Sequence, residues 1–506
     1  MRARFTALAA VLVIVGAALT ACSSGETARR VSPAADWPTY GHDAQHTFHG
    51  QTTLTPASVK RLKMAWKFRT GDAVTATPTV VGGVVYAGSW DEHFYTVDLR
   101  TGKLKWQKKL NSQHAITPYP GQPHRDTGTD GGLVTSSAWY QPAAGGRPDL
   151  VIFGGGYTLY ALDAHTGRTF WTHGYTGRPD LPADPDNDAT RIFSSPVVVG
   201  DKVIFGVDVD GEANHRGYIV AASLATGEPV WKYETDIDTQ GHVLNDGCGS
   251  VWSSGTVLPS LGLVVFGTAD CDLGNQSPTA EAVLALHVND GTPAWTFRPE
   301  RVDPKCDEDF GASANAGVAG DDVTFLGVGS KDGTYYSIDP KAGAQRWATN
   351  VVFGGFSGGF IATAAYDGRA VYASTAIGDF GRFQGATLNS IRCQPSDPRD
   401  TPMQEPSVHA FDAATGAVLW QKNQGASFGA TTVAGGMTFV GLALNGNYVQ
   451  VREAGNGALL DQLQFPSACW SGIATVGDAM VLGLGSSFQG DNDGIVAVTP
   501  GGKAPA

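Results

Sequence analysis

Short runs in which apolar and polar residues alternate recur along the whole chain, separated by turns that contain glycine. Residues 76–87 and 94–98 show the pattern, with Gly82 and Gly83 between two apolar runs. Alternation with a period of two residues is typical of antiparallel β-strands, because successive side chains point to opposite faces of a sheet. The pattern therefore predicts an all-β chain.

The alternating runs belong to a repeated unit that ends in a tryptophan. The phrase Asp-x-x-Thr-Gly-x-x-x-Trp has three close copies and four looser ones, at Asp98–Trp106, Asp163–Trp171, Asp412–Trp420, Ser223–Trp231, His287–Trp295, Asp339–Trp347 and Glu453–Asp461. Three strands, a Thr-Gly turn and a tryptophan strand make one four-stranded propeller blade. We expect the glycine to supply a left-handed turn and the tryptophan to pack between blades.

The last repeated unit lacks one strand, and a strand at the start of the repeated region has no unit of its own. A last unit at 472–498 stops before any tryptophan strand, whereas an isolated strand at 62–66 precedes the first unit. Pairing these segments would remove a free sheet edge. The sequence therefore predicts an eight-bladed β-propeller over residues 36–500, with its ring closed by an N-terminal strand and followed by a disordered tail at 501–506.

The first residues have the pattern of an export signal. Residues 1–21 carry early arginines and an apolar run that is shorter than the roughly 20 residues of a membrane-spanning helix. The run ends in Leu19-Thr-Ala-Cys22, which matches the site where bacterial lipoproteins are cleaved and acylated. We predict a signal peptide at 1–21, a lipid on Cys22, a flexible tether at 22–35, and a protein anchored to the outer face of the cell membrane by the lipid alone.

Charge and cysteine content argue against some classes of partner and cofactor. The formal net charge of −13 argues against binding to nucleic acid. No Cys-x-x-Cys pair is present, which makes a structural zinc site or an attached c-type haem improbable, so any electrons would leave through an external acceptor. Besides Cys22, an odd number of cysteines remains and their pairing is left open: Cys248, Cys271, Cys306, Cys393 and Cys469.

The tryptophan repeat resembles that of quinoprotein alcohol dehydrogenases, which depend on pyrroloquinoline quinone (PQQ). The segment Asp36-Trp-Pro-Thr-Tyr-Gly-His-Asp43 is also similar to the N-terminal motif of this family, especially of its polyvinyl-alcohol dehydrogenases. The resemblance implies a calcium ion that holds the quinone and an aspartate that acts as the base. The expected substrate is a small or polymeric alcohol or a sugar.

Three residues match the family's metal and quinone positions. Glu212 begins a Glu-x-x-x-Arg-Gly-Tyr phrase that resembles the one carrying the calcium-binding glutamate. Trp252 resembles the tryptophan under the quinone. Asp270, eighteen residues later, stands where the family has a metal-binding asparagine, and its carboxylate is still an oxygen ligand suited to calcium.

Two further residues match the catalytic segment and a quinone contact. Asp309 begins an Asp-Phe-Gly-Ala-Ser phrase like that of polyvinyl-alcohol dehydrogenases, which implies a base that also touches calcium. Gly311 stands where a second carboxylate would indicate a lanthanide, so calcium is favoured. Lys331 in Lys-Asp-Gly resembles the lysine that reaches the quinone oxygens.

The residues also permit a second function. The family's adjacent-cysteine pair is missing, and Phe360-Ile361 replaces a polar pair. Without the resemblance, four of the candidates have structural explanations: a loop carboxylate, core packing, a surface acidic cluster and a hairpin turn account for Glu212, Trp252, Asp309 and Lys331. The alternative to a dehydrogenase is a non-catalytic propeller lipoprotein that serves as a protein- or polysaccharide-binding scaffold.

Overall fold

The structure is a computed structural model. It describes residues 36–110, 134–177, 190–209, 215–244, 246–271, 277–300, 308–352, 354, 358–376, 406–442, 446–486 and 493–506. The predicted signal peptide and tether, the lipidation site Cys22, and the candidate ligand Glu212 lie outside these residues.

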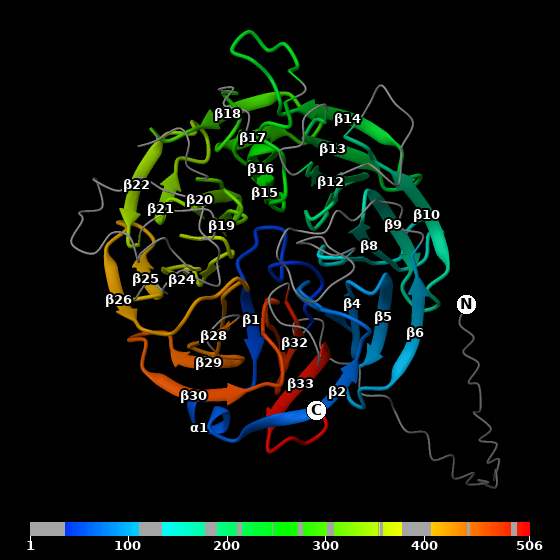
Figure 1. The fold of residues 1–506 in the computed structure, drawn as a ribbon, viewed down its shortest axis with the longest axis vertical. Coiled ribbons are helices and arrows are strands. Elements are labelled where there is room, and N and C mark those ends of the chain that lie inside the picture. The colour runs from blue at the N-terminus through cyan, green and yellow to red at the C-terminus, as the bar shows by residue number, and fades with distance from the viewer. Residues whose placement is uncertain are drawn as a thin grey trace, which may run out of the picture.

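The described strands form a ring of sheets (Figure 1). Six of the sheets have four strands each. In chain order they are β3 (Thr79–Val81), β4 (Val84–Gly88), β5 (His93–Asp98), β6 (Leu104–Lys109); β7 (Trp139–Gln141), β8 (Leu150–Gly155), β9 (Thr158–Asp163), β10 (Thr169–Gly174); β11 (Val197–Val199), β12 (Lys202–Val207), β13 (Tyr218–Ser223), β14 (Pro229–Glu234); β15 (Thr256–Leu258), β16 (Leu263–Gly267), β17 (Val283–His287), β18 (Pro293–Phe297); β19 (Asn315–Ala319), β20 (Asp322–Gly329), β21 (Thr334–Ile338), β22 (Gln345–Asn350); and β23 (Ala365–Tyr366), β24 (Ala370–Ser374), β25 (Val408–Asp412), β26 (Val418–Lys422).

A further sheet has nine strands and contains the first and the last of the described strands. Its order is β2 (Leu62–Arg69), β33 (Gly494–Pro500), β32 (Ala479–Leu484), β31 (Ala474–Gly477), β1 (His49–Thr52), β27 (Thr432–Ala434), β28 (Met437–Gly441), β29 (Tyr448–Glu453) and β30 (Leu459–Gln464). The helical elements among the described residues are short, namely α1 (Pro56–Val59) and the 3-10 turn η2 (Pro259–Leu261). The prediction of an all-β chain is confirmed, and the radial sheets are those of a β-propeller.

Tryptophans of the outer strands join each sheet to the next. Trp171 on β10 donates from Nε1 to the carbonyl of Leu224 at 3.0 Å, across the boundary between two sheets. Its ring lies against Gly227, whose φ of 78° is left-handed and where a Cβ would come within 2.6 Å of the ring. The same indole bond is made by Trp66, Trp106, Trp231, Trp295, Trp347 and Trp420. The left-handed glycine and the tryptophan between sheets are as the repeat predicts, and the glycine in addition leaves room for the ring.

The segment from Trp37 to Thr53 runs around the propeller axis and holds the inner strands together (Figure 1). Its backbone forms hydrogen bonds with several sheets in turn. Trp37 exchanges two bonds with Val80, and Thr53 donates to the carbonyl of Gly477. The other bonds are accepted by carbonyls of the segment, from Tyr140 to Pro38, Val257 to Ala44, Ala316 to Gln45, Tyr366 to Thr47 and Val433 to Phe48. β1 then pairs in parallel with both β27 and β31. The N-terminal segment therefore lies against the inner strands of several sheets.

The early strand β2 lies beside the last strand of the chain, β33. β2 pairs antiparallel with β33, with Leu62 opposite Pro500. The C-terminal residues differ from the expected disordered tail, because Gly501 donates its N–H to the carbonyl of Arg61 at 2.6 Å and Ala506 donates to Asp478 at 3.0 Å. Within the residues that the structure describes, no helix has the length and apolar character needed to cross a membrane.

Candidate functional site

A cavity of about 230 Å³ lies on the propeller axis. Its walls are the short segments that precede the innermost strand of each sheet, and Tyr40 of the N-terminal segment also lines it. The lining is mainly aromatic and hydroxyl-bearing, and includes Trp90, Phe193, Trp252, Phe428, Trp470, Thr75, Thr77, Thr135, Ser195, Ser254 and Ser313. An apolar cavity with a few converging polar groups is the usual form of a small-molecule site.

A row of hydroxyl side chains links neighbouring segments of the cavity wall by hydrogen bonds. The backbone N–H of each residue in the row donates to the side-chain hydroxyl of its counterpart in the next sheet, from Ser137 to Ser195 (2.9 Å), Ser195 to Ser254 (2.9 Å), Ser254 to Ser313 (2.8 Å) and Ser313 to Thr363 (3.0 Å). Tyr40 shares a hydrogen bond of 2.8 Å with Thr363. Sequence reasoning missed this row, although its signal was a serine or threonine two residues before each of the inner strands β7, β11, β15, β19 and β23.

Aromatic side chains from several sheets meet at the cavity. The rings of Trp90 and Trp470 have centroids 6.4 Å apart, and Phe428 meets Trp470 edge-on at 5.1 Å. Trp90 donates from Nε1 to Thr75 Oγ1 at 3.0 Å, which satisfies its polar atom in the buried site. Such rings offer planar apolar faces to a ligand.

Trp252 projects from the segment before β15 toward the neighbouring sheet. A Cβ built on Gly311 would lie 1.7 Å from Cη2 of its indole ring, so the absence of a side chain at position 311 makes room for the ring. Lys331 places its ammonium Nζ 5.3 Å from the ring centroid, a distance at which a cation is attracted to the aromatic face. Gly311 therefore has a steric role in addition to the one inferred from the resemblance.

Gly311→Ala should displace Trp252. We expect the substitution to lower the free energy of unfolding by about 1–3 kcal/mol, the usual cost of overpacking a well-packed site, and to change the tryptophan fluorescence. Denaturant titration and emission spectra check this. Gly455→Ala is the control for the loss of a glycine without crowding, since nothing lies within 4 Å of a Cβ there and its backbone is not left-handed. An unchanged emission spectrum in Gly311→Ala would contradict the steric role.

Asp309 and Lys331 form a buried ion pair beside Trp252. Lys331 Nζ lies 3.0 Å from Asp309 Oδ2, and the two side chains are only 10% and 5% exposed. The backbone N–H of Lys331 also donates to the carbonyl of Asp309 at 2.9 Å. Asp309 Oδ1 is buried and has no hydrogen-bond partner in the part of the chain that the structure describes. A buried carboxylate oxygen without a partner is costly, and this one would suit a cation or a substrate hydroxyl.

Asp270 lies on a segment that adjoins Asp309. Phe310 donates its N–H to the carbonyl of Thr268 at 3.2 Å, and Gly249 donates to the carbonyl of Asp270 at 2.9 Å. The structure thus places Lys331 against both Asp309 and the Trp252 ring and sets Asp270 on an adjacent backbone, whereas Glu212 lies outside the described residues. Among those residues, no group of three or more histidine, cysteine, aspartate or glutamate side chains could hold a metal ion.

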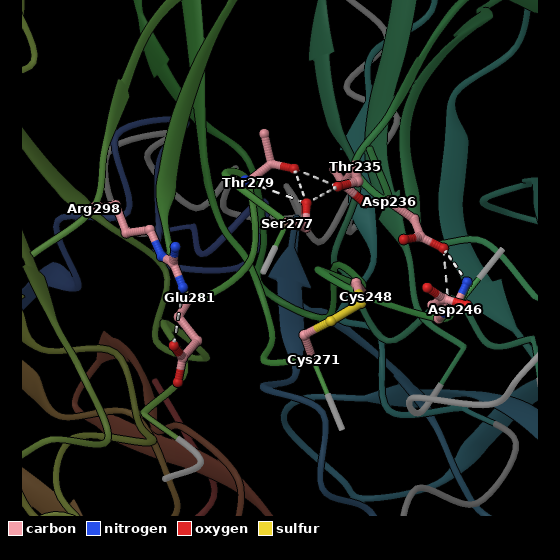
Figure 2. Close-up of a disulfide and its surroundings, with 10 residues drawn as sticks. Thr235, Asp236, Asp246, Cys248, Cys271, Ser277, Thr279, Glu281 and Arg298 are labelled. Carbon is pink, nitrogen blue, oxygen red and sulfur yellow. Dashed lines mark hydrogen bonds and ion pairs between the residues drawn. A yellow bond between two sulfur atoms is a disulfide. The ribbon is translucent and has the colours of Figure 1, made fainter. Parts of the chain in front are cut away.

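A disulfide lies between the Trp252 and Asp270 segments. Cys248 and Cys271 are bonded (Figure 2), which answers one part of the pairing that the sequence leaves open. The bond ties the chain four residues before Trp252 to the residue after Asp270. Cys469 has a free, buried thiol, and burial raises its pKa well above the usual range. Cys306 and Cys393 are outside the described residues.

Residues 37–352 match the family model of the glucose/ethanol/alcohol dehydrogenase β-propeller domain, the PQQ type. The chain belongs to this family. It is 24% identical over 436 residues to polyvinylalcohol dehydrogenase from Sphingopyxis sp. (strain 113P3), covering 79% of this chain and 60% of the relative. It is 25% identical over 364 residues to quinoprotein glucose dehydrogenase from Escherichia coli (strain K12), covering 64% of this chain and 45% of the relative.

The predicted relationship to quinoprotein dehydrogenases is thereby confirmed, and these relatives are named for the oxidation of an alcohol polymer and of a sugar. The chain spans about half the length of the curated relatives it matches. The crystal structure of quinohemoprotein alcohol dehydrogenase from Comamonas testosteroni matches with a TM-score of 0.68 and 18% identity, covering 94% of this chain and 82% of that one. At that identity the likeness shows the fold alone.

Proposed function

We propose that this protein is an exported, lipid-anchored dehydrogenase that uses PQQ and calcium to oxidise an alcohol or a sugar and passes the electrons to an external acceptor. The observation that carries the proposal is the contact of Trp252, Lys331 and Asp309 beside the axial cavity. An aromatic face, a buried cation and a buried carboxylate oxygen are the groups that a planar, anionic quinone and an alcohol would need.

The fold assumed in this proposal has eight blades and a ring closed by the N-terminal strand β2. The pairing of β2 with β33 supports the closure, and so does the bond from Trp66 Nε1 to the carbonyl of Leu99 at 2.7 Å, which joins this strand to the next sheet. The nine-stranded sheet supports the count, because β1 joins β31 to β27 and so links two sets of four strands. The Leu19-Thr-Ala-Cys22 motif supports export and anchoring.

The side chains have distinct roles in this proposal. PQQ, when bound, supplies the acceptor for the hydride that leaves the substrate's carbinol carbon. Asp309 takes the hydroxyl proton at Oδ1, since its Oδ2 is held by Lys331. Trp252 provides the face on which the quinone stacks, and the Lys331 ammonium orients the quinone's oxygens. The calcium ion would be held by Glu212, Asp270 and Asp309, all carboxylates, which are the ligand type that calcium prefers.

The proposal is tested by titrating the purified mature protein with PQQ in the presence and absence of calcium, following tryptophan fluorescence and then dye reduction with alcohols and sugars. We expect saturable, calcium-dependent quenching, and a loss of PQQ affinity of about 10-fold or more in Lys331→Met, because a buried charge-assisted contact is removed. A wild-type protein that binds no PQQ would contradict the proposal and favour the scaffold function.

Lys232→Met is the matched control for this test. Lys232 also combines a carboxylate partner, Glu234 at 2.9 Å, with an aromatic face, the Tyr218 ring at 3.7 Å. It lies on β14, an outer strand, and does not line the cavity. Its replacement is expected to leave PQQ affinity unchanged, so an equal loss in both variants would show that the effect of Lys331 is not local.

A further inference from the structure

Glu281 is a buried carboxylate to which no sequence motif draws attention. It precedes β17, and only 5% of its surface is exposed. Its backbone φ is 48°, in the left-handed region that is uncommon for residues other than glycine. A residue held in such a conformation costs free energy and persists only where its surroundings require it. The contacts of Glu281 therefore need an explanation.

Glu281 joins two backbone segments that carry candidate site residues, one through its side chain and the other through its backbone. Its Oε1 accepts the backbone N–H of Glu308, the residue before Asp309, at 3.0 Å. Its own backbone N–H donates to the carbonyl of Ala269, the residue before Asp270, at 2.8 Å. Arg298 Nη2 lies 3.6 Å from Oε2 and supplies the countercharge that a buried carboxylate needs.

The same network extends to the segment of Lys331. The hydroxyl of Ser330 donates to the carbonyl of Glu308 at 2.9 Å, and the N–H of Lys331 donates to the carbonyl of Asp309 at 2.9 Å. Residues 308 and 309 are thus held on one side by Glu281 and on the other by residues 330 and 331. Bonds to a charged acceptor are stronger than those between neutral groups, so the bond from Glu308 to Glu281 holds this segment more firmly than the neutral bonds from residues 330 and 331.

We propose that Glu281 is a positioning residue, which fixes the Asp309 carboxylate in register with Asp270 and Lys331. The inference rests on the proposed dehydrogenase function, in which Asp309 is the base. Glu281 acts through the backbone and reaches neither substrate nor quinone itself. A small shift of a catalytic group lowers the rate steeply even when binding is kept, so the effect of its loss should fall on kcat.

The test compares Glu281→Ala with Glu281→Gln, whose amide oxygen still accepts the N–H of Glu308. In the protein without cofactor, we expect Glu281→Ala to raise amide hydrogen exchange in peptides containing residues 308–310 by about 10-fold and Glu281→Gln to raise it much less. In the loaded enzyme, Glu281→Ala should lower kcat by about 10-fold or more with little change in KM, and Glu281→Gln should recover most of the loss.

Glu234→Ala, which removes a carboxylate from an ion pair on β14, is the control and should leave both readouts unchanged. If Glu281→Ala does not fold, Arg298→Met, which removes the partner of Oε2, should raise the same exchange by about 3-fold. If Glu281→Ala leaves hydrogen exchange at 308–310 unchanged, or binds PQQ normally and keeps the wild-type kcat, the positioning role of Glu281 is wrong and the proposed function still stands. Failure of the wild-type protein to bind PQQ would instead overturn the proposed function.

Discussion

Asparagine in place of Asp309 is expected to lower kcat by about 10²–10⁴-fold, the range that general base catalysis contributes. The amide keeps the size of the side chain and an oxygen acceptor, but its oxygen is too weak a base to take a hydroxyl proton. Lys331 loses its ionic partner at 3.0 Å while the hydrogen bond from its backbone remains. We therefore expect PQQ affinity to fall less than turnover. Dye-reduction kinetics together with fluorescence titration separate the two effects.

Asp367→Asn is the matched control for this substitution. Asp367 is a turn aspartate of a neighbouring sheet that accepts the Tyr372 hydroxyl at 2.9 Å and the N–H of Arg369 at 2.9 Å. It does not line the axial cavity, so its replacement should leave kcat unchanged. Turnover in Asp309→Asn within about 3-fold of wild type would exclude Asp309 as the base, because removal of a true base has a far larger effect.

The repeat could be predicted from the sequence because each of its residues has a local structural role. The Thr-Gly turn needs a left-handed residue, as at Gly227, and the tryptophan four residues later, Trp231, docks on the next sheet. A local rule repeated in every unit leaves a periodic signal. The C-terminal tail gave no such signal. Its order depends on Arg61 and Asp478, which are distant in sequence.

The candidate site was readable only where the family resemblance supplied the residues. Trp252, Asp309 and Lys331 come from different segments, and their contact depends on neighbouring sheets, which no local pattern specifies. The Cys248–Cys271 bond could not be chosen among the possible pairings from spacing alone. Glu281 could not be found at all, because its role rests on backbone hydrogen bonds to residues that the chain brings together only on folding.

Trp171→Ala is expected to lower the free energy of unfolding by about 3–5 kcal/mol, as large-to-small changes of buried aromatic residues do. The indole is only 8% exposed, it lies on Gly227, and its N–H donates to the carbonyl of Leu224. Since that carbonyl belongs to the next sheet, the loss also loosens the boundary between sheets. Urea unfolding followed by circular dichroism measures the change.

Trp171→Phe separates packing from hydrogen bonding at this boundary. The phenyl ring can still cover Gly227, whereas the donor to Leu224 is lost, so we expect a cost of about 1–3 kcal/mol from the smaller ring and the unsatisfied carbonyl. Phe170→Ala on the same strand is the control, because that side chain is 41% exposed and surface changes usually stay within about 0.5 kcal/mol. If Trp171→Ala cost no more than Phe170→Ala, the sheets would be held by their inner strands and the N-terminal segment. The repeated tryptophan would then need an explanation other than stability.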